Sequence, residues 1–106
     1  MTVVENPCMI GNCWVDHPPT WVLDHSPTRG AALLVHLVMA ERAGLLFPDD
    51  GGPVWVAAAD AALYAALCRC THELVEAIWA DMVRLGLIVA LVVDDDPSWL
   101  MRFEAA

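Results

Sequence analysis

The sequence contains no lysine, and its only strongly basic residues are five arginines. Fourteen Asp and Glu residues give a formal net charge of −9 at pH 7. A protein with this charge repels phosphate polyanions and favours basic or apolar protein partners. The composition therefore argues against binding nucleic acid through a broad basic patch.

The sequence also lacks an apolar run long enough to span a membrane. Its longest runs, residues 30–40 and 85–93, are much shorter than the roughly 20 residues that cross a bilayer, and His36 interrupts the first. The opening MTVVENPC has no basic segment followed by an apolar one, as a signal peptide requires. We expect a cytoplasmic protein with no membrane contact.

Common catalytic motifs are absent as well. The sequence has no GxSxG, HExxH, phosphate-loop or Rossmann glycine pattern. Two Asp-His pairs, Asp16-His17 and Asp24-His25, lie in or beside an irregular segment, where such pairs usually serve turns and caps. We expect no enzymatic activity.

Four cysteines form two close pairs, and a disulfide framework is not expected in a cytoplasmic chain. Structural zinc needs four N or S ligands, which these cysteines could supply with His17 and His72. The spacing is not that of a CxxC knuckle, and cysteine often serves as a small buried apolar residue. We expect no cofactor and keep as an alternative a zinc site drawn from Cys8, Cys13, Cys68, Cys70 and His72.

What the sequence does contain is a large apolar fraction, 58%, with a mean hydropathy of +0.53. A chain of 106 residues forms one domain with a modest core. Some apolar surface is then left over, and self-association is the simplest way to cover it.

The first part of the chain predicts an arm followed by a helix. Residues 1–25 have several prolines and no sustained period, so we expect an irregular arm that Trp14 and Trp21 anchor to the body. Ser26 as N-cap and Pro27 at the first helical position predict a helix over residues 27–43. This helix is apolar almost all round, so it is either central to the domain or shared with a second subunit.

Five further elements follow. Residues 47–53 are a loop by composition, residues 54–56 a short strand, and residues 58–67 a helix with Asp60 in its first turn. Thr71 starts a helix over residues 71–85, which Gly86 ends. Residues 87–93 and 99–103 predict a hairpin around an acidic turn at residues 94–97.

This order of elements resembles a winged helix-turn-helix domain. The residues that carry the resemblance are Trp55, YAALC at 64–68, the turn ending at Thr71, the helix 71–85 and GLI at 86–88. They resemble bacterial winged helix-turn-helix regulators and the replication-protein helix-turn-helix domains of plasmids and phages, over about residues 18–104. The resemblance implies an α+β fold, mainly α with a small β-hairpin: three helices plus a wing in residues 26–106, after the arm at 1–25.

In that family the helix beginning at Thr71 is the recognition helix, which enters the major groove. Here this helix and the wing tip carry carboxylates, and three adjacent aspartates at the tip oppose docking to phosphate. Only Arg69 and Arg84 remain as candidates for contacts with DNA phosphates. The expected partner face therefore comprises Arg69, His72, Glu73, Glu76, Arg84, Asp94, Asp95 and Asp96.

A homodimer is expected as well, through the apolar helix and the arm. If His36 lies at the dimer seam, its protonation near pH 6 could modulate assembly. The expected interface residues are Trp14, Trp21, Leu33, Leu34, His36 and Leu37.

We therefore expect a small winged-helix regulatory protein that acts mainly through protein contacts, as an adaptor or antagonist with an acidic recognition face. Its partner would be a basic or DNA-binding protein. The alternative is a transcriptional or replication regulator that binds duplex DNA through the helix 71–85. A third interpretation is a zinc-stabilised structural module.

Overall fold

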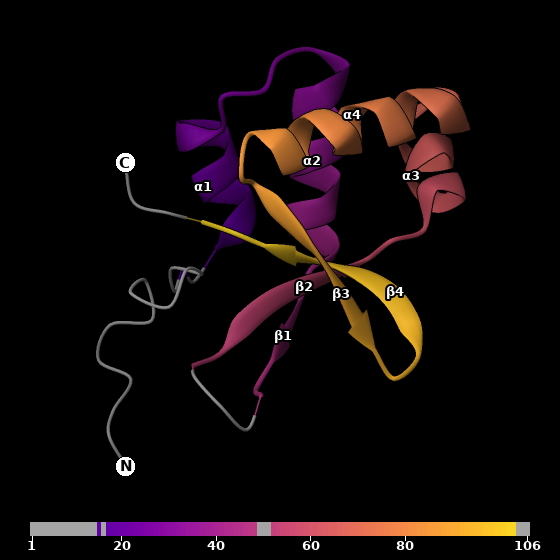
Figure 1. The fold of residues 1–106 in the computed structure, drawn as a ribbon. Coiled ribbons are helices and arrows are strands. Elements are labelled where there is room, and N and C mark those ends of the chain that lie inside the picture. Colours follow the sequence, from indigo (N-terminus) through magenta and orange to yellow (C-terminus); the bar gives the residue numbers. More distant parts are fainter. Residues whose placement is uncertain (1–14, 16, 49–51, 104–106) are drawn as a thin grey trace.

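A computed structural model describes residues 15, 17–48 and 52–103 of the chain. These residues form four helices and one four-stranded antiparallel sheet, which confirms the α+β class (Figure 1). The elements in chain order are α1 (Pro18–His25), α2 (Ala31–Arg42), β1 (Gly44–Leu46), β2 (Val54–Ala58), α3 (Ala61–Cys68), α4 (His72–Arg84), β3 (Ile88–Val93) and β4 (Asp96–Met101).

The prediction of an irregular arm over residues 1–25 is wrong for residues 18–25, because these residues form α1. Pro18 and Pro19 suit the first turn of a helix, where a backbone N–H would have no intrahelical partner. The described part of the chain thus has four helices instead of the three expected. Residues 1–14 and 16, including Trp14, lie outside the described residues.

Helix α2 begins four residues later than predicted, at Ala31. The predicted cap, Ser26, is engaged elsewhere: its Oγ accepts a hydrogen bond from the Thr28 N–H at 3.1 Å and lies 2.8 Å from His36 Nδ1. Gly30 takes the N-cap position with φ 59°. Glycine adopts a positive φ without the steric cost that a side chain would bring.

Helices α3 and α4 are held by side-chain caps. Asp60 accepts from the Leu63 N–H at 3.2 Å, so it caps α3 and does not lie in its first turn. Thr71 accepts from the Leu74 N–H at 3.1 Å, which confirms the predicted start of α4. Each cap satisfies a donor that has no partner inside its helix.

The sheet has the strand order β1-β2-β4-β3, so it is larger than the predicted hairpin. Strand β1 was not predicted, and β2 extends to Ala58. Strand β4 is central because it pairs with β2 on one side, Trp55 opposite Met101, and with β3 on the other, Ile88 opposite Met101. The sheet therefore joins the middle of the chain to its last described strand.

The hairpin turn is tighter than the predicted four residues. Asp94 and Asp95 form it alone, with φ 51° and 67°. Two successive residues at positive φ match the twist of a two-residue hairpin, and aspartate tolerates this region better than most residues. As a result β4 begins at Asp96, three residues before the predicted strand at 99–103.

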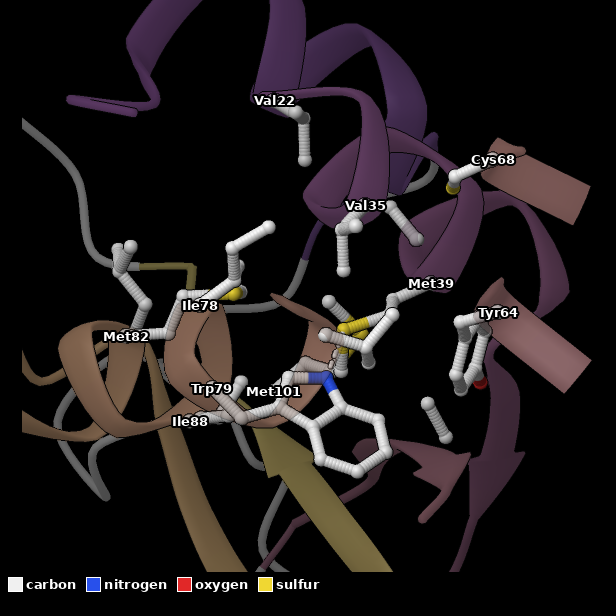
Figure 2. Packing of buried hydrophobic residues seen from close by; sticks show 14 of the residues in the cluster. Val22, Val35, Met39, Tyr64, Cys68, Ile78, Trp79, Met82, Ile88 and Met101 are labelled. Carbon is white, nitrogen blue, oxygen red and sulfur yellow. Dashed lines mark hydrogen bonds between the residues drawn. The ribbon is translucent and has the colours of Figure 1, made fainter. Parts of the chain in front are cut away.

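The core lies between the helices and the sheet. Figure 2 shows Trp79 of α4 against Met39 of α2, and the Trp79 Nε1–H donates to Met39 Sδ at 3.2 Å. The Tyr64 and Trp99 rings meet Trp79 edge-on at centroid distances of 5.8 and 5.4 Å. This aromatic group ties α3, α4 and β4 together.

Among the described residues, no helix has the length and apolarity that a membrane crossing requires.

Candidate functional site

A cleft lies between α4 and the hairpin, with a volume of about 680 Å³. Its walls are the end of β2, the start of α3, the first half of α4 and the tip of the β3–β4 hairpin. The polar groups that line it are His72, Glu76, Asp60, Asp94 and Asp96, and the apolar ones include Val56, Ala59, Trp79, Val93 and Pro97. We call this feature the acidic cleft.

Local structure explains why these side chains meet. The Ala59 N–H donates to the Pro97 carbonyl at 3.1 Å, beyond the last β2–β4 pair, so Asp60 is held beside the hairpin. His72 and Glu76 are four residues apart on α4, which places them on the same side of the helix. The tight turn then presents Asp94 and Asp96 to the same space.

The charged side chains that line the acidic cleft are all carboxylates. Four carboxylates line it, all on exposed residues, and no arginine does. Apolar residues line the acidic cleft as well, among them Val56, Val93, Pro97 and the largely buried Trp79, and we call them the apolar floor. Such a site suits a cationic side chain, because its aliphatic stem can cover the floor while its charged head meets the carboxylates.

Four of the eight residues expected on the partner face do not line the acidic cleft: Arg69, Glu73, Arg84 and Asp95. Arg69 is the exposed C-cap of α3. Arg84 is at the far end of α4, where its guanidinium lies 2.7 Å from Asp81 Oδ1. The structure therefore brings together His72, Glu76, Asp94 and Asp96 and leaves both arginines out of the acidic cleft.

Sequence reasoning missed Asp60 as a site residue. Its local signal was only that of a carboxylate at a helix start, and its place in the acidic cleft follows from the β2–β4 pairing. No local pattern predicts such a long-range pairing.

The expected dimer residues are largely used inside one copy. His36 has no exposed surface within one copy, and the dimer interface expected around it stays a prediction. Its burial involves α1, whose Trp21 ring lies 6.2 Å from the His36 ring. Leu33, Leu37 and Trp21 pack half-buried against the core, and among the expected interface residues that the structure describes only Leu34 is exposed, at 42%.

Burial also sets the chemistry of His36. It lowers the pKa of the imidazole to about 4, because a charge there would lose its hydration. Nδ1 is 2.8 Å from the Ser26 hydroxyl, and Nε2 has no hydrogen-bond partner. His36 is therefore a neutral core residue at ordinary pH.

The described cysteines are free thiols. Cys68 is buried, and burial, with a smaller effect of nearby Cys70, raises the pKa of its thiol. Within residues 15, 17–48 and 52–103, no three His, Cys, Asp or Glu side chains come together to hold a metal ion. Cys8 and Cys13 lie outside the described residues, so the zinc alternative stays a prediction.

Comparisons with known proteins found no matching family model, no matching curated protein and no matching solved structure. The geometry of the chain itself carries the functional argument.

Proposed function

We propose that this chain is a small regulatory protein of the winged-helix type that acts through protein contacts. The order of α2, β2, α3, α4 and the hairpin supports this assignment, as does the pairing of β2 with the second strand of the hairpin. Helix α1 and strand β1 are additions to that plan. Helix α4 takes the place of the recognition helix, and the β3–β4 hairpin takes the place of the wing.

The observation that carries the proposal is the acidic cleft. A winged helix that meets DNA needs cations on the recognition helix and wing, because neutralising phosphate supplies essentially all of non-specific affinity. Here four carboxylates line the space between these two elements. The partner we propose is a basic segment of another protein, and the regulatory role is that of an adaptor or an antagonist.

The recognition chemistry follows from the lining. An arginine or lysine of the partner would lay its stem on Trp79 and Pro97 and its charged head among the carboxylates. Electrostatic attraction of this kind raises the association rate and selects the partner's charge, and salt weakens it. No catalytic step and no metal ion takes part in the role that we propose.

Binding of a fluorescent arginine- and lysine-rich peptide tests this. Wild-type protein should bind it in a salt-dependent way, and Glu76→Gln and Asp96→Asn should each weaken binding by about two- to fivefold, as for single exposed charges. Glu41→Gln is the matched control, since Glu41 is an exposed carboxylate on α2 outside the acidic cleft. Equal affinity for all four proteins would contradict the proposal.

A second candidate is a regulator that binds duplex DNA through α4. One observation favours it: exposed Arg69 lies next to the N-terminal end of this helix, where a recognition helix makes base and phosphate contacts. A glutamate there can accept from cytosine N4. Salt-dependent binding of random duplex at low salt, lost in Arg69→Ala, would support this candidate over the first.

A further inference from the structure

Strand β3 forms one edge of the sheet, and among the described residues it pairs with β4 alone. Its sequence, IVALVV, has no charge, proline or glycine over six residues. Edge strands of soluble proteins are usually short or carry charges, prolines or bulges, which prevent another strand from pairing with them. The opposite edge, β1, fits that rule with three residues, whereas β3 does not.

The same strand carries exposed apolar side chains. Val89 is 43% exposed and Val92 is 69% exposed. The hairpin extends away from the helices (Figure 1). Side chains three residues apart on a strand point to opposite faces of the sheet, so Val89 and Val92 place one exposed apolar group on each side of the backbone edge. We call this accessible edge with its two valines the β3 edge.

The charges at the two ends of the β3 edge are opposite in sign. The acidic turn with Asp94, Asp95 and Asp96 follows the strand. Arg84 precedes it, and Arg102 lies at the same end, because its N–H donates to the Leu87 carbonyl at 2.9 Å. Arg84 pairs with Asp81, but both side chains are highly exposed, at 72% and 59%, and such a pair is weak enough to exchange partners.

From these observations we propose that two copies of the chain associate by antiparallel pairing of their β3 strands. A two-fold axis perpendicular to the sheet would place Ala90 or Leu91, the middle of β3, opposite its own copy. The two four-stranded sheets would then form one continuous sheet. The inference does not depend on whether the acidic cleft binds a basic partner.

Charge complementarity selects this partner and this direction. In the antiparallel arrangement the acidic turn of each copy meets the Arg84 end of the other, and the contact occurs twice. A parallel arrangement would bring like charges together at both ends. An uncharged strand with an acidic and a basic end is thus complementary to a second copy of itself. In the resulting dimer the β3 edge of each copy is covered by that of the other.

Sedimentation velocity over a wide range of protein concentration tests the pairing. Wild-type protein should show a concentration-dependent dimer. Ala90→Lys places like charges near the two-fold axis and should raise the dimer dissociation constant by about tenfold or more. Val92→Lys gives a second variant at a side chain that is already exposed, and circular dichroism checks that both remain folded.

Ala66→Lys is the matched control, because it makes the same charge change at an exposed position of α3. It should dimerise like the wild type. A wild type that stays monomeric throughout, or folded Ala90→Lys and Val92→Lys proteins that dimerise like the control, would overturn the proposal.

A charge exchange tests the direction of pairing. Arg84→Glu alone creates two repulsive contacts in its own dimer, and Asp96→Arg alone weakens both contacts because it takes the charge of the turn from −3 to −1. Each variant alone should therefore dimerise less well than the wild type. A mixture of the two variants should dimerise. One contact of the mixed dimer then pairs Arg84 with Asp96 as in the wild type, and the other pairs the two substituted positions with their charges exchanged. Failure of the mixture to dimerise, with a dimeric wild type, would rule out the antiparallel arrangement.

Discussion

The Ser26 hydroxyl lies 2.8 Å from Nδ1 of His36, a ring that has no exposed surface. Ser26 belongs to the link between α1 and α2, so this contact joins the link to the centre of α2. The other ring nitrogen, Nε2, has no partner, and burial lowers the pKa of the ring to about 4. The packing of α1 on α2 therefore requires a neutral histidine.

The first prediction is a loss of stability in mild acid. The pKa of His36 in the folded protein, about 4, lies below the ordinary histidine value of 6.5, so the unfolded chain binds the proton more tightly. The stability that the neutral His36 ring contributes to the fold is fully present above pH 6.5 and is lost as the pH falls from there to about 4. Between about pH 7.5 and about pH 4.5 we expect titration of His36 to lower the free energy of unfolding by roughly 2–3 kcal/mol.

Urea unfolding of the wild type and of His36→Gln over this pH range measures the effect. Glutamine cannot titrate, so the difference in stability between the two proteins isolates the histidine from the carboxylates. That difference should change with pH in the stated window. A constant difference would mean that His36 does not have the lowered pKa.

The second prediction concerns the Ser26 hydroxyl. Ser26→Ala removes the hydrogen-bond partner of Nδ1 and leaves a buried ring with no partner on either nitrogen. We expect a loss of about 1–3 kcal/mol of unfolding free energy, the cost of an unsatisfied buried polar group. Thr20→Ala, at an exposed site on α1, should change stability by less than about 0.5 kcal/mol. Similar losses in the two variants would contradict the role of this contact.

The third prediction is that Arg69→Gly stabilises the fold. Arg69 caps α3 with φ 56° and ψ 50°, a left-handed conformation that costs a residue with a side chain more than it costs glycine. We expect thermal or urea unfolding to show a gain of about 0.5–1 kcal/mol.

Gly86→Ala is the reverse case. Gly86 has φ 76°, and no atom lies near the place of an added Cβ. We therefore expect Gly86→Ala to lower the free energy of unfolding by about 1 kcal/mol, through backbone strain alone. A destabilised Arg69→Gly protein would show that the arginine side chain makes a contact worth more than the strain.

The fourth prediction separates the two described thiols. Cys68 is buried and its thiol pKa is raised, so little reactive thiolate is present, whereas Cys70 is partly exposed. In a background of Cys8→Ser and Cys13→Ser, the variant that keeps only Cys68 should react slowly with a thiol reagent until urea is added. The variant that keeps only Cys70 should react faster in the native state. Equal native rates would contradict the burial of Cys68.

Local signals in the sequence predicted α4 well. Thr71 caps it, Leu74 donates to that cap, and Gly86 follows its end with positive φ. The strand at β3 and the acidic turn were also predicted, because an apolar β-branched run next to three aspartates is a local pattern. Each of these features depends on residues that are close in sequence.

The features that were missed depend on competition or on distant pairing. Ser26 is a good N-cap by type, but its hydroxyl bonds to His36 and Thr28 instead, so α2 starts later. Helix α1 is short and begins with two prolines, and its packing against the core through Val22 and Trp21 stabilises it. The acidic cleft needs Asp60 beside the hairpin, which depends on the β2–β4 pairing.

The central position of β4 has a consequence for the order of folding. Strand β2 can pair with β1 as soon as it is made, but its second partner, β4, is present only when the chain has been made as far as Met101, which pairs with Trp55. Helices and their contacts can form earlier, since they join residues near in sequence, whereas the sheet must close a long loop. During synthesis the helices and the β1–β2 pair would therefore form before β4 completes the sheet, and β3 would wait with both edges open until β4 arrives.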